Sequence, residues 1–467
     1  KVFLSQMKHR TTSWLYGVLG LLLLGCADQP KTAVFFGGQI INPSSDYVTL
    51  YKDNKAIDCL KLNAENRFFK QYDTLAAGIY NIEHIPEYQA VFLEPGDSMW
   101  VRINASAFRE SMVFSGLGAP KNNYLIDLQL RMDREDDFLT EQYAGSADRF
   151  HQIIDSLQAE KQVLWRLLDS LNRQSLLAKT ITQAAYQYPY ATRRERYALL
   201  RGSQWSTQED SAYFAFRSSL NLEEKALSFF DHYINYLMNY LNQEALDSGQ
   251  NYFQQKQKTA FHQKRLQIID KSFTYPALKN NLARAVAIEE LLNFQNHNQH
   301  DAFLEYYFSI NSSKDYDSDV LSMHNDINHL NSGVVLPTVE LQNSALEIVR
   351  SNQLFDGRPV VLYFWSQTQM NHYRRAIERM QFLQKKYPKI RFVGISIQQF
   401  NGMALQANKV LGVNPNNQFA FHQFDTASKE WVITLLNKAI ITDGKGVLIE
   451  GFGNFQSPEI EEILDRF

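Results

Sequence analysis

Residues 334–467 alternate between short apolar runs and amphipathic stretches, and this alternation constrains the fold of the chain most strongly. Residues 359–365 form an almost continuous apolar run, which is typical of a strand buried on both faces. Residues 370–387 have helical periodicity and end before Pro388, and residues 390–397 predict a second buried strand. Further expected elements are a helix over 405–411, a strand over 419–424, a hairpin of 439–441 and 447–449 around Asp443-Gly444-Lys445-Gly446, and a helix over 458–467. The order predicts an α/β domain.

The region before it, residues 119–330, has few glycines and long helical patterns. The clearest candidate helices are 150–171, 227–241 and 282–294. The basic run Arg193-Arg194-Glu195-Arg196 is interrupted by a glutamate, so we expect a solvated helix face there rather than a nucleic-acid site. The middle of the chain is therefore predicted to be α-helical.

Residues 33–118 contain short strand patterns separated by turn residues. Such punctuation predicts an antiparallel β-sandwich. The expected strands are 33–36 and 39–41 around Gly37-Gly38, 47–51 after the turn cluster 42–46, and 89–93 and 98–103 around the turn 94–97. The chain is thus expected to be multidomain, with a β-sandwich, a helical middle and a C-terminal α/β domain over 334–467.

The N-terminus has the pattern of a secretory signal. Residues 8–10 (Lys-His-Arg) precede the uncharged run 14–24, which is too short to span a bilayer. The run ends in Gly25 and Cys26, which resembles the bacterial lipobox, where cleavage precedes a cysteine that becomes lipidated. We therefore expect a signal peptide over 1–25, a lipidated Cys26 followed by a tether over 26–32, and a location in the cell envelope. A buried hydrophobic helix with a chance cysteine is the alternative.

Cysteine is rare in this chain and charge is nearly balanced. The two cysteines are Cys26 and Cys59, so a lipidated Cys26 leaves Cys59 without an intramolecular partner. Residues 56–60 read as a strand, and we expect Cys59 to be a buried, inert thiol rather than a reactive one. A net charge of −3 gives no indication of nucleic-acid binding.

The two ends of the chain resemble known protein families. Residues 334–467 resemble the TlpA/ResA-like thioredoxin family, and residues 33–125 resemble a β-domain of unknown function that often precedes such domains in Bacteroidota lipoproteins. The thioredoxin likeness rests on 360–365, the helix after it, 392–396 and the Asp443 turn, with 336–341 similar to the family's extra N-terminal hairpin strand. The β-domain likeness rests on 92–98, 114–116 and 122–125.

The chain departs from the thioredoxin pattern at the redox site. The family carries a Cys-x-x-Cys at the start of the helix after the Phe-Trp strand, where the helix dipole stabilises a thiolate. Those two positions fall on Gln369 and His372. The family's facing cis-proline falls on Asn437, or on Leu435 if the alignment slips by two residues. Neither Gln369 nor His372 can form a disulfide.

The resemblance therefore implies a thioredoxin-like fold without redox activity. We expect an envelope lipoprotein with a binding or scaffold role and no catalytic residue or cofactor. Trp365, Met370 and Asn437, with the two altered motif positions, are expected to line a cleft for an envelope protein or peptide. A thiol–disulfide oxidoreductase or peroxidase-like protein of the same family is the alternative. It would need a cysteine at this site.

Other candidate sites are weaker. His297 and His300, or His324 and His329, could contribute to a zinc site, but loop or surface histidines are the favoured interpretation because no cysteine or clear carboxylate set accompanies them. The acidic turn 94–97 could bind calcium, although a β-turn uses the same residues. No metal site is therefore expected.

Overall fold

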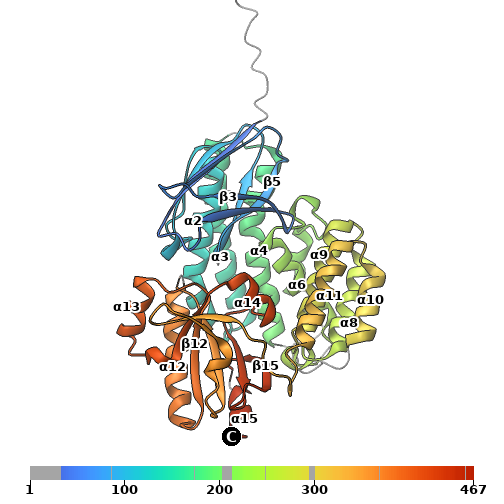
Figure 1. The fold of residues 1–467 in the computed structure, drawn as a ribbon. Coiled ribbons are helices and arrows are strands. Elements are labelled where there is room, and N and C mark those ends of the chain that lie inside the picture. Colours follow the sequence, from blue (N-terminus) through green and yellow to red (C-terminus); the bar gives the residue numbers. More distant parts are fainter. Residues whose placement is uncertain are drawn as a thin grey trace, which may run out of the picture.

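The computed structural model has a β-rich N-terminal part, a helical middle and a C-terminal part built on a large sheet (Figure 1). It describes residues 33–85, 87–172, 174–201, 213–247, 249–293, 300–367, 369–457 and 459–467. Cys26 and the predicted signal segment 1–25 lie outside these residues.

The β-rich part contains two four-stranded sheets, ordered β4-β1-β7-β8 and β3-β2-β5-β6. Their strands are β1 (Val34–Ile41), β2 (Tyr47–Lys52), β3 (Lys55–Lys61), β4 (Arg67–Tyr72), β5 (Gly78–His84), β6 (Glu87–Leu93), β7 (Ser98–Asn104) and β8 (Val113–Leu117). A short 3-10 helix, η1 (Ala105–Ala107), lies between β7 and β8. The prediction of a purely antiparallel sandwich is wrong for one pair, because β1 and β7 run parallel. Between β1 and β7 the chain also forms strands of the other sheet, and β7 then runs in the same direction as β1.

Strand β1 runs without a break through Gly37 and Gly38, where two shorter strands were expected. A Cβ atom on Gly38 would lie 2.5 Å from the carbonyl oxygen of Val101. Glycine is therefore required here for close approach to β7 and does not mark a turn.

The start of helix α2 is joined to both sheets by two asparagines. The Oδ1 atom of Asn122 accepts the Phe92 N–H at 2.7 Å, and its Nδ2 donates to the Phe92 carbonyl at 2.9 Å. Asn123 makes the same pair of bonds with Phe114, at 2.8 and 2.9 Å. Each side chain thus replaces a strand partner and fixes the helical part against the β-rich part.

The middle of the chain is helical, as predicted. Its elements are α2 (Ala119–Gln142), α3 (Ala147–Leu171), α4 (Leu176–Arg201), η3 (Phe214–Ser219), η4 (Lys225–Leu227), α6 (Asp231–Ala245), α7 (Tyr252–Gln255), α8 (Thr259–Ser272), α9 (Pro276–Leu291), α10 (His300–Ile310) and α11 (Lys314–Asn328). The three candidate helices correspond to α3, α6 and α9, with ends displaced by up to six residues.

The predicted solvated face on α4 is wrong for three of its four residues, and only Arg196 is exposed. Arg193, Arg194 and Glu195 are all buried. Arg193 forms ion pairs with α2, Arg194 with α3, and Glu195 with η3. Their charges are therefore paired inside the helical part, with partners from three neighbouring elements.

A seven-stranded sheet forms the C-terminal part, ordered β10-β9-β13-β12-β11-β14-β15. Strands β11, β12 and β13 are parallel, and β9, β14 and β15 pair antiparallel. The elements are β9 (Glu340–Asn343), β10 (Ile348–Arg350), η6 (Ser351–Leu354), β11 (Val360–Trp365), α12 (Met370–Lys386), β12 (Arg391–Ser396), α13 (Gly402–Val410), η7 (Pro415–Asn417), β13 (Gln418–Phe421), α14 (Phe424–Glu430), β14 (Lys438–Thr442), β15 (Leu448–Asn454) and α15 (Glu459–Leu464).

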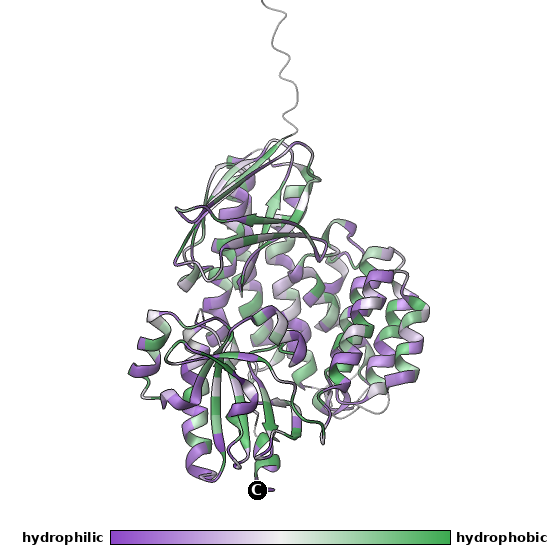
Figure 2. Ribbon diagram, in the orientation of Figure 1, coloured by the Kyte–Doolittle hydropathy of each residue, from purple (hydrophilic) through white to green (hydrophobic). Residues whose placement is uncertain are grey.

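The predicted order of strand, helix, strand, hairpin and helix is confirmed. Every residue of β11 is buried, because this strand lies in the middle of the sheet and both its faces are covered. Hydrophobic residues concentrate on the strands of the C-terminal sheet (Figure 2). One apolar cluster continues from Leu237 and Val286 of the helical part to Leu362 and Ile395 on one face of the sheet. The helical and C-terminal parts therefore share a core.

Candidate functional site

The predicted site lies where α12 begins, directly after the buried strand β11. Gln369 precedes the first residue of the helix and its side chain is exposed, while His372 lies in the first turn and is half-buried. A helix start provides unpaired backbone N–H groups that would stabilise a thiolate. An amide and an imidazole occupy the two positions here, so no thiol is present for these groups to act on.

Gln369 connects this helix start to the β-rich part. Its Nε2 donates to Oε1 of Glu87, the first residue of β6, at 3.2 Å. The bond is exposed, so its contribution to stability is small. It nevertheless shows that the first altered position faces another part of the molecule.

His372 and Asn437, two of the predicted site residues, are in contact. The Nε2 atom of His372 is 2.8 Å from Oδ1 of Asn437. Because an amide oxygen only accepts, the Nε2–H donates in this arrangement. Asn437 is also held by its carbonyl, which accepts the Phe455 N–H at 2.7 Å. The imidazole is therefore anchored to the loop that leads into β14.

Trp365 does not line an open cleft, contrary to the prediction. Its side chain is 0% exposed and stacks on Tyr373 at 3.8 Å between ring centroids. The last residue of a central strand points its ring under the following helix, so the indole stabilises the α12 packing instead of contacting solvent. Met370 begins α12, but its side chain lies outside the described part of the structure.

A cleft of about 710 Å³ separates the outer face of β2, β3 and β5 from the C-terminal part. Gln369 lines it, and so does Cys59 of β3. The prediction that Cys59 is buried is wrong, because its side chain is exposed and the neighbouring Leu60 points into the core. The strand alternation places Cys59 on the face opposite to Leu60. The cleft therefore contains one thiol.

Each wall of the cleft carries one carboxyl group. The Tyr51 hydroxyl donates to Oε2 of Glu83 at 2.8 Å, and both residues line the cleft together with Asp425 of α14. Burial raises the pKa of Glu83, and the charge of Asp425 raises it further, while the Tyr51 bond opposes this shift. Lys429 of α14 also lines the cleft. The two carboxyl groups outnumber this single ammonium group, so they favour a bound group that carries positive charge or donates hydrogen bonds.

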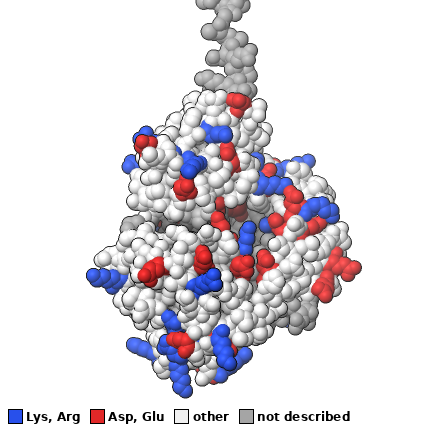
Figure 3. Space-filling view, in the orientation of Figure 1, with Lys and Arg blue, Asp and Glu red and all other residues white. Residues whose placement is uncertain are grey.

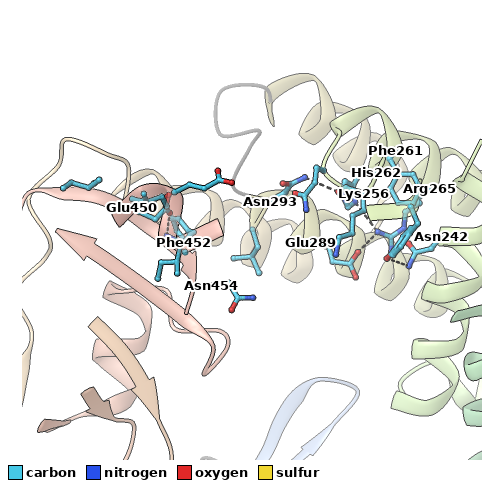
Figure 4. Close-up of a pocket in the computed structure, with 18 of the residues that line it drawn as sticks. Asn242, Lys256, Phe261, His262, Arg265, Glu289, Asn293, Glu450, Phe452 and Asn454 are labelled. Atoms are coloured by element: carbon cyan, nitrogen blue, oxygen red, sulfur yellow. Dashed lines mark hydrogen bonds and ion pairs between the residues drawn. The ribbon is translucent and has the colours of Figure 1, made fainter. Parts of the chain in front are cut away.

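A second cavity, of about 730 Å³, lies between the helical part and β15 with α15 (Figure 4). Arg265 of α8 forms an ion pair with Glu289 of α9 on one wall. Glu450 and Phe452 of β15 lie on the opposite wall (Figure 4). None of the predicted site residues lines this cavity.

The weaker metal candidates do not assemble into sites. His297 lies outside the described residues, and His300 is buried with its Nε2 3.8 Å from Oε1 of Glu290. Within the described ranges, no group of three or more His, Cys, Asp or Glu residues could hold a metal.

The two carboxylates of the acidic turn 94–97 form ion pairs with a lysine. Nζ of Lys121 lies 2.5 Å from Oε1 of Glu94 and 2.9 Å from Oδ1 of Asp97. Lys121 and Asp97 are buried. The turn thus neutralises an ammonium group and is not arranged for calcium.

On the face shown in Figure 3, Lys and Arg are interspersed with Asp and Glu. In the helices that the structure describes, none is long and apolar enough to cross a membrane.

Glu87, Tyr51 and Glu83 were not predicted from the sequence as residues of the site. Tyr47, Thr49 and Tyr51 alternate with apolar residues along β2, which indicates an outward-facing polar row. That pattern could have marked the face. Its position opposite α12 depends on how distant parts of the chain pack, and no local pattern reports it.

No protein family and no curated protein matches this sequence. Among solved structures, the chain is similar to the thioredoxin domain of a thiol-disulfide oxidoreductase from Bacteroides vulgatus, at 17% identity and a TM-score of 0.25, covering 29% of this chain and 99% of that one. It is also similar to a thiol-disulfide oxidoreductase from Bacteroides fragilis (20% identity, TM-score 0.23, covering 28% and 98%). A third similar structure is a thiol:disulfide interchange protein from Bacteroides sp. (17%, TM-score 0.24, covering 29% and 91%).

Proposed function

We propose that this protein is a cell-envelope lipoprotein, anchored through Cys26, whose C-terminal thioredoxin-like domain binds a partner and does not exchange disulfides. The strand order supports the fold assignment. Strand β11, helix α12 and the parallel strand β12 are followed by the antiparallel pair β14 and β15 and by helix α15. This is the order expected of a thioredoxin fold.

The observation that carries the functional proposal is the occupancy of the two redox positions. Gln369 hydrogen-bonds to Glu87, and His372 hydrogen-bonds to Asn437. Disulfide exchange proceeds by attack of a thiolate on a disulfide sulfur. Neither side chain has a sulfur atom, so the helix start provides hydrogen-bonding groups where a redox protein provides a nucleophile and its resolving partner.

Partner binding would use the cleft beside these residues. Tyr51 and Gln369 provide polar groups on its two walls. Glu83 and Asp425 add two carboxyl groups against the one ammonium group of Lys429. An extended segment of an envelope protein fits such a surface, because its backbone can exchange hydrogen bonds with the polar wall. A basic side chain in that segment would complement the two carboxyl groups.

Single-thiol chemistry at Cys59 is the second candidate function. Cys59 is exposed and lines the same cleft as Gln369. One thiol can form a mixed disulfide with a client protein, but a second thiol is needed to release that client within the same active site. This alternative retains the oxidoreductase class and requires an external thiol for turnover.

An insulin-reduction assay with dithiothreitol separates the two functions. The proposed binding protein gives no insulin precipitation above the dithiothreitol background, and Cys59→Ser gives the same trace as the wild type. Turnover above background that is lost in Cys59→Ser would establish the oxidoreductase alternative.

Membrane anchoring is tested separately in cells. Cys26→Ser removes the atom that would carry lipid, so this variant should move from the membrane fraction to the soluble fraction. A Cys26→Ser protein that remains with the membrane would contradict the lipid anchor.

A further inference from the structure

The outer face of the sheet β4-β1-β7-β8 exposes large apolar side chains. Phe69 of β4 is 61% exposed and Trp100 of β7 is 36% exposed. Val113 and Leu117 of β8 are exposed at 58% and 61%. These residues lie on neighbouring strands, so they form one surface, called the aromatic face below.

Backbone register brings the two rings together over a glycine. Gly37 of β1 pairs with Phe69 on one side and with Trp100 on the other. A Cβ atom on Gly37 would lie 3.0 Å from each ring, so the rings reach across the central strand. Phe35, two residues earlier on the same face, stacks with Phe69 at 6.3 Å between centroids. The aromatic face is therefore continuous over three strands.

The charge of this face is one-sided. Gln39 pairs with Arg67 on β4 and with Arg102 on β7, which places both arginines in the row next to the rings. Within the described strands of this sheet, no Asp or Glu side chain lies on the aromatic face. Asp73, just after β4, lies at the end of this face, where its Oδ1 accepts a hydrogen bond from Gln71. The whole chain has a net charge of −3, so strands that place two arginines and no acidic residue on one face differ from the average surface.

The predicted anchor lies within short reach of this face. Only seven peptide steps separate Cys26 from Ala33, which precedes β1 in the middle of the sheet. A chain spans at most about 3.5 Å per residue, so the lipid can lie no more than roughly 25 Å from the start of β1. The β-rich part must stay close to the bilayer if Cys26 is lipidated.

We infer that the aromatic face lies against the headgroup region of the bilayer that holds the Cys26 lipid. The inference rests on the proposed anchor. Trp and Phe side chains favour the membrane interface, where an apolar ring can be buried beside polar headgroups. Arg67 and Arg102 would contact lipid phosphates and favour anionic lipid.

The test uses a chain that starts at residue 27, which carries no lipid and retains every described residue. Its binding to phosphatidylethanolamine vesicles containing phosphatidylglycerol is measured by co-sedimentation. We expect binding that falls about tenfold or more in Phe69→Ser/Trp100→Ser, since two interfacial rings are lost. Arg67→Gln/Arg102→Gln should remove the preference for phosphatidylglycerol over phosphatidylcholine.

The matched control is Phe138→Ser/Phe382→Ser, which removes two exposed rings from α2 and α12 and should leave binding unchanged. Circular dichroism confirms that each variant is folded. A wild-type chain that does not bind vesicles, or a control that loses binding equally, would overturn the inference. So would a wild-type dimer, detected by analytical ultracentrifugation, that the ring variant dissociates. Because the chain that starts at residue 27 lacks Cys26 and its attached lipid, these results do not depend on whether Cys26 is modified.

Discussion

Burial shifts the pKa values of two ionisable residues near the site, Lys438 and Glu450, in opposite directions. Lys438 donates from Nζ to the carbonyls of Trp431 and Val432, at 2.8 and 3.0 Å, and burial lowers its pKa to about 7. Glu450 accepts the Phe452 N–H at 2.6 Å, and burial raises the pKa of its carboxyl to about 7. Burial penalises the charged form of each residue. Stability should therefore depend on pH near neutrality.

Glu450→Gln should reduce this pH dependence. The pKa of Glu450 in the folded protein lies above its ordinary value of 4.5, so the folded state holds a proton that the unfolded state loses between pH 4.5 and 7. Stability from this residue is complete below pH 4.5 and is lost as pH rises to 7. The glutamine variant should thus gain about 1–3 kcal/mol relative to wild type between pH 5 and pH 7.5. Urea denaturation at both pH values measures the change, and equal pH dependence in the two proteins would refute the assignment.

At the scale of elements, α4 is the central helix of the middle region. Successive residues on a helix point about 100° apart, so three consecutive buried residues require neighbours on several sides. Arg193, Arg194 and Glu195 meet this condition with partners on α2, α3 and η3. Glu195 is 0% exposed and accepts two bonds of 2.7 Å from Arg217. These ion pairs fix the directions in which the neighbours pack.

Glu195→Gln should destabilise the protein by about 2–4 kcal/mol, because it leaves the partly buried Arg217 guanidinium without the buried carboxylate that accepts two of its hydrogen bonds. Glu244→Gln is the matched control. Glu244 binds the same arginine at 2.7 Å but is 38% exposed, so its loss should cost less than about 1 kcal/mol. Urea unfolding of both variants provides the comparison. Equal losses would show that burial of the pair is unimportant.

Elements with strong local patterns were predictable, and features set by distant packing were not. The apolar run of β11 and the Asp443 turn indicated the C-terminal sheet, because burial on two faces and hairpin chemistry leave local signatures. The parallel pairing of β1 with β7 and the burial of Arg193 depend on residues far away in the chain. Cys59 was placed in a strand correctly, but only the packed sandwich decides which strand face is covered.

The same distinction applies to the site. The proximity of His372 and Asn437 was expected from the resemblance, since the family places a proline facing its Cys-x-x-Cys motif and Asn437 was aligned with that proline. The contact between Gln369 and Glu87 joins two parts of the chain that no local pattern relates. The covered indole of Trp365 likewise follows from how α12 lies on the sheet.

At the scale of the whole molecule, the site is formed by more than one part. The cleft has one wall from the β-rich part and one from the C-terminal part, and the helical part shares its core with the C-terminal sheet. A partner bound in the cleft would contact both walls at once. The proposed anchor enters the β-rich part, so the cleft would be held at a limited distance from the membrane.

Gln369 and His372 are proposed to occupy the positions of a redox pair. The most direct measurement is a thiol titration of Gln369→Cys/His372→Cys, made in a Cys59→Ser chain that starts at residue 27 and therefore has no other cysteine. After mild oxidation, we predict that the two introduced thiols disappear into an intramolecular disulfide and that the reduced variant reduces insulin, while the Cys59→Ser parent does not. Two thiols that remain free after oxidation would contradict the account.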